Sequence, residues 1–286
     1  MEKFCCLACS RDQGSPLITD CPDYYLGTPY RVDFWKCSAC GLVQQHPIPE
    51  DTTAFYADYP IHAKKGPLFR WFRRLLMASS YYPAKAAPNH RRLLDFGCGD
   101  GWFLESCQDK NLGLAGFERN HAHAQRLSAE LGVPIHSDLE GLLREEHASF
   151  DIVTMNFVVE HLTDLHATFA HAASLLKTGG TFYFSVPAYD AVEHKIFGKN
   201  WHSLDAPRHI SFPSPPVVAS LAEQHGFRLS RTQRLPFPSD FAASLTVALA
   251  GKFSYPIFLA CLPLSLVFNL FCRTSAYGYW LDKKPE

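Results

Sequence analysis

One short stretch constrains the fold of this chain more than any other. Residues 91–101 read RRLLDFGCGDG: an apolar strand closes at Asp95 and Phe96, a turn follows with glycine at every second position, and a helix begins at Trp102. Such glycines let the backbone approach a ligand closely and adopt φ values that other residues resist. The helix N-terminus beyond them offers free N–H groups. The stretch predicts a ligand-binding turn at the carboxyl end of a parallel strand, with a purely structural turn as the alternative.

The spacing and charge of this turn favour one kind of ligand. The glycines follow G-x-G-x-G, not the G-x-G-x-x-G of a dinucleotide site, and the acids Asp95 and Asp100 suit a cationic aminoacyl group better than a pyrophosphate. LLDFGCGDG resembles the first motif of class I S-adenosylmethionine-dependent methyltransferases. The resemblance implies that Asp95, Gly97 and Gly99, with Cys98 between them, contact the amino-acid end and ribose of S-adenosylmethionine.

The composition of the chain limits its possible size, partners and cellular location. The chain has 286 residues, 47% of them hydrophobic, enough for one large domain and a small extra one. A formal net charge of −1 provides no field that would attract nucleic acid, so no nucleic-acid partner is expected. The N-terminus lacks the apolar core of a secretory signal, and ten cysteines in such a chain suggest thiols and metal ligands in a reducing compartment. We expect a cytoplasmic protein, with the inner face of a membrane as an option.

Residues 1–45 read as a small zinc-ribbon-like module. Cys6-x-x-Cys9 and Cys37-x-x-Cys40 place four soft ligands at zinc-finger spacing, although the 27 residues between the two pairs exceed the usual gap. Four cysteine ligands leave no open position, so the expected Zn²⁺ is structural. Unliganded buried cysteines are the alternative. Such a module before a methyltransferase motif is similar to one methyltransferase group that includes sugar C-methyltransferases.

Residues 46–90 form a linker with two notable features. Phe55, Tyr56 and Tyr59 make an aromatic cluster, which the resemblance places over the cofactor. Residues 64–77 carry five cationic side chains, no acid and many apolar ones. This pattern is typical of a basic amphipathic helix, which can lie on an anionic membrane or cover the cofactor cleft with its cations in solvent.

Residues 91–286 predict an α/β methyltransferase domain. Apolar strands alternate with helical stretches, as in Rossmann-like doubly wound folds with a mostly parallel seven-stranded sheet. After 91–96 we expect strands at 112–117, 133–135, 150–156, 181–186 and 227–235, and an antiparallel last strand at 277–282. Helices are expected at 121–131, 165–176 (with a C-terminal cap at 178–180) and 215–226.

Three polar residues at strand ends extend the predicted cofactor site. Glu118 ends the second strand about twenty residues after the glycine turn, where an acid can bind ribose hydroxyls. The resemblance matches Asp138 to an acid that meets the adenine amino group, and Asp138 can equally cap the following helix. Asn156 ends the strand at 150–156, at the same edge of the sheet.

Two histidines are candidates for catalysis. His161 follows the strand at 150–156 as part of a Glu-His pair, and this segment resembles the one after the fourth strand of the family, where such a pair is frequent; His161 can act as a general base or be a structural histidine. Quinone O-methyltransferases, a related branch, hold a divalent cation with an added acid three residues before that Glu. Here Phe157 takes that place, so the resemblance does not extend to bound magnesium.

A polar loop at 200–210 provides the second histidine. The loop is rich in Trp, His, Asp and Arg, and it is similar to a W…D-x-P-R-H stretch on the substrate side of the family. We expect His209, Arg208 and Trp201 to face the acceptor; a hydrogen-bonded structural loop is the alternative.

Residues 236–274 form an apolar insertion before the last strand. Between Phe241 and Cys272 the only charge is Lys252, and residues 253–272 would be long enough to span a bilayer. One crossing would separate the last strand from its sheet, so we expect a segment that enters the membrane and returns, or a pair of helices over the cleft. Pro256 and Pro263 favour a bent path. With the basic stretch at 64–77, the insertion predicts peripheral membrane contact through 240–272.

The sequence therefore predicts S-adenosylmethionine-dependent methyl transfer to a small-molecule, saccharide or lipid-linked acceptor. A non-catalytic zinc-ribbon protein on a methyltransferase-like scaffold and an NAD-dependent oxidoreductase are the alternatives. The spacing of the glycines and the acids around them count against the oxidoreductase.

Overall fold

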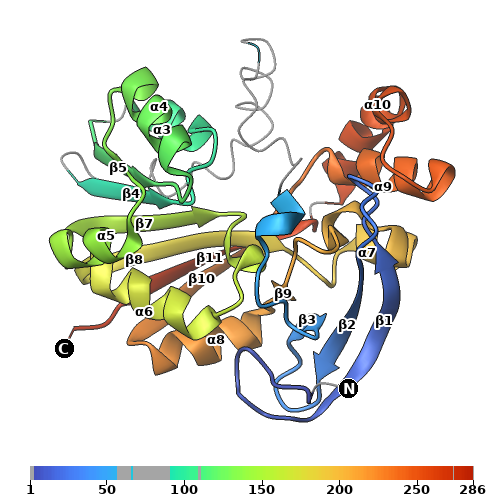
Figure 1. The fold of residues 1–286 in the computed structure, drawn as a ribbon, viewed down its shortest axis with the longest axis horizontal. Coiled ribbons are helices and arrows are strands. Elements are labelled where there is room, and N and C mark those ends of the chain that lie inside the picture. The colour runs from blue at the N-terminus through green and yellow to red at the C-terminus, as the bar shows by residue number, and fades with distance from the viewer. Residues whose placement is uncertain (1–2, 57–65, 67–90, 109–110, 273, 286) are drawn as a thin grey trace.

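A seven-stranded sheet organises the molecule (Figure 1). The computed structural model describes residues 3–56, 66, 91–108, 111–272 and 274–285. The strand order of this sheet is β10-β11-β8-β7-β4-β5-β6. Its strands are β4 (Arg92–Phe96), β5 (Gly113–Phe117), β6 (Ile135–His136), β7 (Phe150–Asn156), β8 (Leu176–Pro187), β10 (Phe227–Leu235) and β11 (Ala276–Lys283).

The pairing of these strands confirms the predicted fold class. The five strands from β6 to β8 are parallel to one another, and β11 is antiparallel to both β8 and β10. The order reverses beside β4, so the carboxyl ends of β4, β5 and β7 meet at the point where ligands bind in such sheets.

Helices cover both faces of this sheet. In Figure 1, α3 and α4 lie on one face, and α6 and α8 on the other. The helices are α3 (Trp102–Cys107), α4 (His121–Leu131), α5 (Leu139–Glu145), α6 (Leu165–Leu175), α7 (Val192–Phe197) and α8 (Pro215–Gln224), and the 3₁₀ turns are η1 (Thr53–Tyr56), η5 (Val159–His161), η6 (Gly198–Asn200) and η7 (His202–Leu204). The predicted helix cap at 178–180 was wrong, because β8 begins directly after α6 and includes these residues.

A four-stranded sheet joins the N-terminal module to the rest of the chain. It contains β1 (Gly14–Pro22), β2 (Arg31–Cys37), β3 (Val43–His46) and β9 (Ser211–Phe212), in that order. Because β9 follows the polar loop of 200–210, the module pairs directly with a segment of the large domain. The Gln45 side chain strengthens this junction by donating hydrogen bonds to the carbonyls of Pro207 and His209 (2.6 and 2.8 Å). The predicted boundary at residue 45 separates the N-terminal module from the rest of the sequence, but the four-stranded sheet contains strands from both sides of this boundary.

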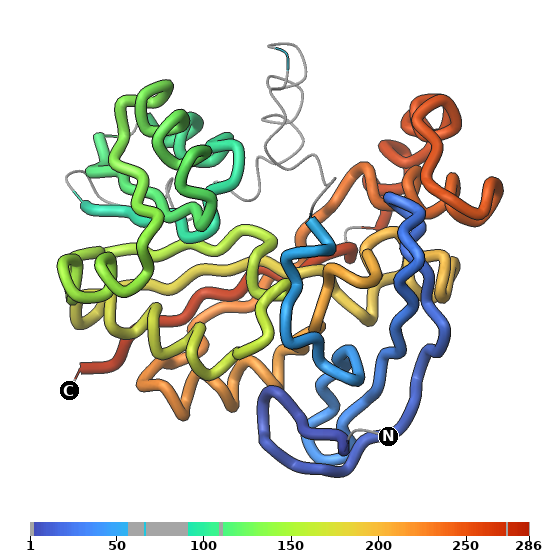
Figure 2. The backbone as a smooth tube through the Cα atoms, viewed as in Figure 1, coloured from blue at the N-terminus to red at the C-terminus, as the bar shows by residue number. Residues whose placement is uncertain are grey.

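The apolar insertion folds into two helices that pack on each other, α9 (Asp240–Ala250) and α10 (Tyr255–Phe271). Pro263 lies inside α10, which continues past it. From α10 the chain returns through β11 to a C-terminus at the opposite end of the molecule (Figure 2). No helix within the described part of the chain is long and apolar enough to cross a membrane.

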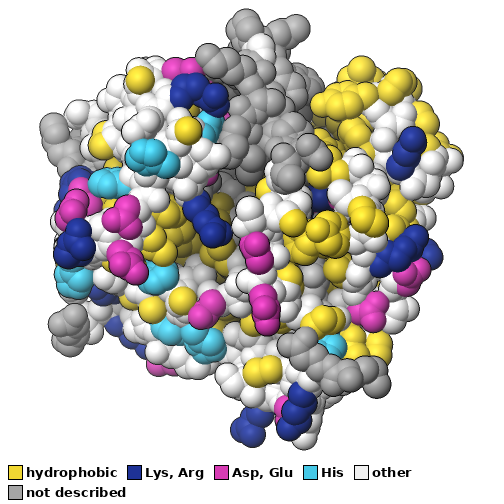
Figure 3. Space-filling model, viewed as in Figure 1, with side chains coloured by type: hydrophobic (Ala, Val, Ile, Leu, Met, Phe, Trp, Pro, Cys, Tyr) yellow, Lys and Arg dark blue, Asp and Glu magenta, His cyan; other side chains and the backbone are white. Residues whose placement is uncertain are grey.

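The side chains of α10 are arranged with inverted polarity. Its buried residues are the polar Ser265 and Asn269. Ser265 Oγ donates a hydrogen bond to the carbonyl of Pro238 and accepts one from the backbone N–H of Ala242. Large apolar side chains of the two helices are exposed instead, and Figure 3 shows hydrophobic surface over this part of the molecule; they are Leu249, Tyr255, Leu259, Leu264, Val267, Leu270 and Phe271.

Candidate functional site

The glycine turn lies where the carboxyl ends of β4 and β5 meet. The backbone N–H groups of Gly97 and Cys98 both donate to the carbonyl of Phe117 (2.8 and 3.0 Å), which ties the turn to the end of β5. Gly97, Gly99 and Gly101 have φ values of +75°, +52° and +77°. All three positions therefore favour glycine on backbone grounds.

The three glycines differ in how closely other side chains pack against them. A Cβ on Gly97 would lie 2.7 Å from the Val158 side chain, and one on Gly101 would lie 2.7 Å from Leu127. No atom of the described residues lies within 4 Å of a Cβ built on Gly99. Two of the glycines thus permit close packing, and Gly99 leaves its side of the turn open for a ligand.

Asp95 lies at the end of β4 with its carboxylate buried. Thr154 Oγ1 and Asn156 Nδ2, both from β7, donate hydrogen bonds to Asp95 Oδ1 (2.7 and 3.4 Å). Burial raises the pKa of Asp95 to about 7, against these two hydrogen bonds that favour the ionised form. Asn156 Oδ1 is buried and has no hydrogen-bond partner among the described residues. The structure thus brings two predicted cofactor residues together, with an acceptor oxygen free to bind a donor group of a ligand.

Glu118 and Asp138 follow the next two strands of the sheet. Glu118 is nearly buried at the end of β5, and its Oε1 accepts a hydrogen bond from the backbone N–H of Asn120 (3.0 Å). Asp138 is exposed and caps α5 through a hydrogen bond from the N–H of Glu140 (3.2 Å), as the capping interpretation predicted. Its contact with adenine stays a prediction.

One residue beside the turn was missed from the sequence. His123, on α4, is buried, and its Nε2 hydrogen bonds to the carbonyl of Gly99 (2.7 Å). This bond holds the open part of the turn from the side of α4. The available signal was the position of His123 in the first turn of a helix directly after the Glu118 strand.

The turn η5 contacts the polar loop of residues 200–210. The backbone N–H of Ile210 donates to the carbonyl of Glu160 (2.6 Å), and the rings of His161 and His209 pack edge to face with centroids 4.6 Å apart. One carboxylate oxygen of Glu160 and one ring nitrogen from each histidine lie within 4.8 Å of one another. The two predicted catalytic histidines therefore lie side by side.

Hydrogen bonds at Nδ1 define the state of both histidines. His161 Nδ1 lies 3.1 Å from the carbonyl of Arg208 and 2.9 Å from Tyr56 Oη, and His209 Nδ1 lies 2.8 Å from the carbonyl of Ser203. A carbonyl can only accept, so each Nδ1 carries the proton and each neutral ring keeps its Nε2 lone pair. Burial lowers the pKa of His161, and burial together with the neighbouring His161 lowers the pKa of His209 to about 3. Both rings are thus neutral near pH 7.

Arg208 and Trp201, predicted to face the acceptor, bond to other parts of the protein. Both are fully buried. The Arg208 guanidinium forms ion pairs with Asp23 of the N-terminal module (2.8 Å) and with Asp205 (2.7 Å), and Trp201 Nε1 donates to Asp240 of α9 (2.7 Å). These bonds give both residues a role in joining the loop to its neighbours, and their contact with substrate stays a prediction.

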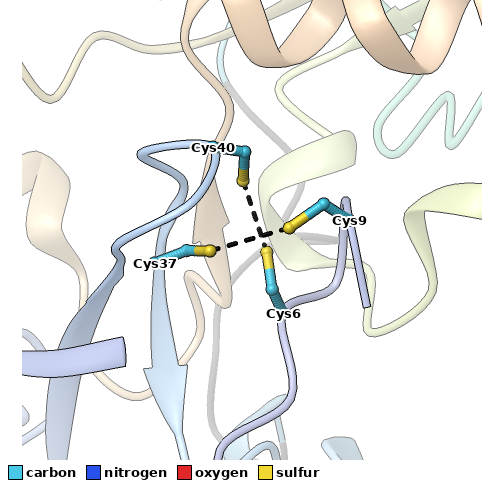
Figure 4. A group of neighbouring side chains, drawn as sticks. All are labelled: Cys6, Cys9, Cys37 and Cys40. Atoms are coloured by element: carbon cyan, nitrogen blue, oxygen red, sulfur yellow. Dashed lines mark hydrogen bonds between the residues drawn. The ribbon is translucent and has the colours of Figure 1, made fainter. Parts of the chain in front are cut away.

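The four cysteines of the N-terminal module converge (Figure 4). The Sγ atoms of Cys6 and Cys40 are 3.5 Å apart, those of Cys9 and Cys37 are 3.6 Å apart, and all four lie within 4.8 Å of one another. A tetrahedral Zn²⁺ with bonds of about 2.3 Å requires sulfur atoms roughly 3.8 Å apart. The donor set and its spacing therefore fit a tetrathiolate zinc site.

Only part of the linker belongs to the described residues. Tyr59 and residues 64–77, apart from Gly66, lie outside the described residues. Phe55 packs on Tyr30 (ring centroids 4.9 Å apart), and Tyr56 contacts His161 as given above.

Comparisons with known proteins agree with this geometry. A family model described as "Methyltransferase domain" matches residues 65–231, more than half of the chain. A ubiquinone biosynthesis O-methyltransferase of Saccharophagus degradans is 30% identical over 115 residues, covering 38% of this chain and 49% of that protein. One of Coxiella burnetii is 27% identical over 154 residues, covering 49% and 64%. The chain thus matches roughly half to under two thirds of the length of these relatives.

Solved structures show the same fold. A possible histamine N-methyltransferase from Thermotoga maritima has a TM-score of 0.53 and 17% identity, covering 76% of this chain and 95% of that one. A methyltransferase from Archaeoglobus fulgidus has a TM-score of 0.51 and 18% identity, covering 75% and 94%. Taken with the glycine turn and the sheet order, these matches show that the chain belongs to the methyltransferase domain family and has the class I S-adenosylmethionine-dependent methyltransferase fold.

Proposed function

We propose that this protein transfers a methyl group from S-adenosylmethionine to a hydrophobic small-molecule acceptor. The observation that carries the proposal is the edge of the sheet where Asp95, Gly99 and Glu118 follow adjacent strand ends, with the Gly99 side of the turn open. Carboxylates at both strand ends suit a cationic aminoacyl nucleoside and disfavour a pyrophosphate. Bound there, the cofactor would supply an electrophilic methyl group on its sulfonium.

Each cofactor residue has a distinct part in this proposal. The buried carboxylate of Asp95 and the free Asn156 Oδ1 would bind the positively charged amino-acid end. Glu118 would accept hydrogen bonds from ribose hydroxyls, and Asp138 would meet the adenine amino group. The backbone of Gly97, Cys98 and Gly99 would contact the ligand closely, because the two glycines have no side chain that would keep the ligand away from the backbone.

The histidine pair is proposed to serve the acceptor. With Nδ1 protonated, the Nε2 of His161 or His209 can take the proton that the acceptor loses as its nucleophilic atom forms the bond to the methyl carbon. The carbon–sulfur bond breaks in the same step, and S-adenosylhomocysteine leaves. Burial excludes water from this end of the site and keeps both rings neutral and able to accept.

The apolar insertion supports a lipid-like acceptor reached from a membrane surface. The large exposed side chains of α9 and α10 are apolar, the buried Ser265 is hydrogen-bonded inside the protein, and no acid occurs from Phe241 to Cys272. A helix with this polarity is more stable against acyl chains than against water. The ubiquinone biosynthesis relatives also favour an acceptor of this class.

We also propose a structural zinc ion in the N-terminal module. Cys6, Cys9, Cys37 and Cys40 would hold it and leave no open position for catalysis. Zinc there would stabilise β1–β3, and through β3 and β9 it would support the loop that carries His209.

Calorimetry with S-adenosylhomocysteine tests the cofactor site directly. We expect binding in the micromolar range, weakened at least about tenfold by Glu118→Gln, a loss that corresponds to roughly 1.4 kcal/mol. The matched control is Glu140→Gln, at an exposed residue on α5. Tight binding of NAD in place of S-adenosylhomocysteine would overturn the proposal. Mass spectrometry of lipid extracts from cells with and without the gene would then identify the acceptor by a difference of one methyl group.

A further inference from the structure

Two buried hydroxyl groups on β8 lack hydrogen-bond partners close to the proposed cofactor site. Tyr183 and Ser185 are completely buried, and neither Tyr183 Oη nor Ser185 Oγ has a hydrogen-bond partner among the described residues. A buried hydroxyl that stays unpaired costs free energy, so such groups are rare in folded proteins. Two of them on one strand therefore indicate a place where a ligand supplies the missing hydrogen bonds.

The strand register places these hydroxyls in line with Asn156. Ser185 pairs with Asn156 of β7 on one side and with Gly278 of β11 on the other, and paired residues share a face of the sheet. A Cβ built on Gly278 would lie 3.1 Å from Tyr183 Oη, so this hydroxyl lies over Gly278. The three atoms without partners, Asn156 Oδ1, Ser185 Oγ and Tyr183 Oη, thus form one row across β7, β8 and β11. The row begins beside the carboxylate of Asp95, to which Asn156 Nδ2 donates a hydrogen bond.

This row extends away from the half of the sheet that is assigned to the cofactor. The amino-acid end and ribose are assigned to Asp95 on β4 and to Glu118 after β5, whereas Ser185 and Tyr183 belong to β8, on the other side of β7. A group bound by the two hydroxyls would therefore lie beyond the amino-acid end of the cofactor, on the side left for the acceptor. This placement rests on the proposed methyl transfer.

The backbone beside the row is strained at the end of β7. Phe157 has a φ of +55°, which is uncommon for a bulky residue, and residues in such conformations cluster at active sites and ligand-binding sites. The N–H of Phe157 donates to the carbonyl of Ser185 (3.0 Å), which fixes the strained residue to β8. The chain then enters η5, which contains His161. The strained residue thus connects the row of polar atoms to the proposed base.

The surroundings of the row favour a neutral ligand. Burial raises the pKa of Tyr183, and the neighbouring Ser185 hydroxyl, not a charged group, opposes this rise. The carboxyl group of Asp95 at the start of the row would disfavour an anion. The hydroxyls of Tyr183 and Ser185 can each donate and accept a hydrogen bond, whereas Asn156 Oδ1 can only accept. A neutral hydroxyl group, which also donates and accepts, matches this set of atoms.

We infer that Ser185 and Tyr183 form a hydrogen-bonding subsite for a neutral hydroxyl group of the acceptor. The subsite would favour acceptors that carry a hydroxyl near the atom to be methylated, and would orient that atom toward the sulfonium. Neither residue binds the cofactor in this assignment, so loss of either hydroxyl should affect the acceptor side alone.

Benzyl alcohol is a suitable probe, because toluene provides the same ring without the hydroxyl. In the full-length chain, saturation-transfer NMR titrations with and without S-adenosylhomocysteine should show benzyl alcohol binding about fivefold more tightly than toluene. Ser185→Ala and Tyr183→Phe should each remove most of this difference and leave toluene binding unchanged. Ser220→Ala and Tyr30→Phe, the same changes at exposed residues, should bind both probes like the wild type.

Thermal unfolding without ligand separates this role from a structural one. Each change removes a hydroxyl without a partner, so the thermal midpoints of Ser185→Ala and Tyr183→Phe should equal or exceed that of the wild type. A lower midpoint for both variants would show that the hydroxyls stabilise the fold and would overturn the inference. Equal binding of the two probes by the wild type, or an unchanged affinity of both variants for benzyl alcohol, would also overturn it.

Calorimetry with S-adenosylhomocysteine distinguishes this inference from the proposed function. Both variants should bind S-adenosylhomocysteine like the wild type, and weaker binding would assign the hydroxyls to the cofactor and refute an acceptor subsite. A wild type that binds benzyl alcohol through Ser185 and Tyr183 but does not bind S-adenosylhomocysteine would contradict the proposed methyl transfer and confirm the hydroxyl site.

Discussion

Replacing Asp95 by asparagine should stabilise the free protein and weaken its binding of cofactor. The buried carboxyl has its pKa raised from 3.8 to about 7, a shift of roughly three pH units, which corresponds to about 4 kcal/mol of unfavourable ionisation at high pH. Asparagine is neutral and nearly the same shape. It keeps an acceptor for Thr154 Oγ1 but adds an N–H that costs about 1–3 kcal/mol if it stays unpaired. The net gain should be about 2 kcal/mol, or roughly 3–4 °C in the thermal midpoint of a chain of 286 residues.

The sign of the pH dependence provides the sharper test. Because the folded-state pKa of Asp95 lies above its unfolded value, the stability that the protonated carboxyl provides is full below the unfolded pKa and is lost as pH rises to about 7. The advantage of Asp95→Asn should therefore be small near pH 4 and largest at about pH 8, in thermal unfolding followed by circular dichroism.

Glu140→Gln, at an exposed carboxylate on α5, is the control and should change stability by less than about 0.5 kcal/mol at either pH. Calorimetry should show weaker binding of S-adenosylhomocysteine to Asp95→Asn. A variant that is less stable than the wild type at the higher pH, or whose advantage does not change with pH, would show that burial of this carboxylate is not the dominant effect.

Three further changes test other parts of the structure. Cys37→Ser should release one equivalent of zinc, measured by metal analysis, and lower the thermal midpoint, whereas Cys5→Ser, at an exposed cysteine outside the cluster, should do neither. Arg208→Met should destabilise the fold by about 3–5 kcal/mol in urea unfolding, because it leaves two buried carboxylates without their cation; a change below about 1 kcal/mol would contradict this. Leu270→Ser with Phe271→Ser, at side chains 75% and 83% exposed, should abolish sedimentation with anionic liposomes and leave stability unchanged. Equal sedimentation of this variant and the wild type would remove the proposed membrane contact.

The architecture could be predicted because its signals are local. The glycine turn at 97–101, the alternation of apolar strands with helices, and the acid at Glu118 each depend on neighbours within a few residues. The antiparallel last strand could also be placed, since the topology leaves it one position beside β8. Strand and helix ends were less certain, and the expected cap at 178–180 failed because glycine is compatible with both a helix end and a strand.

Local sequence thus determined the fold class, the cofactor turn and the cysteine pairs, because periodicity, backbone freedom and ligand spacing act over short distances along the chain. Only the tertiary structure decided which side chains are buried together. In the folded protein Arg208 forms a buried ion pair with Asp23, Trp201 donates a hydrogen bond to Asp240, and His209 lies near Glu160. The physical reason is that the free energy of a charged side chain depends on its surroundings in space, and those are known only once distant segments pack.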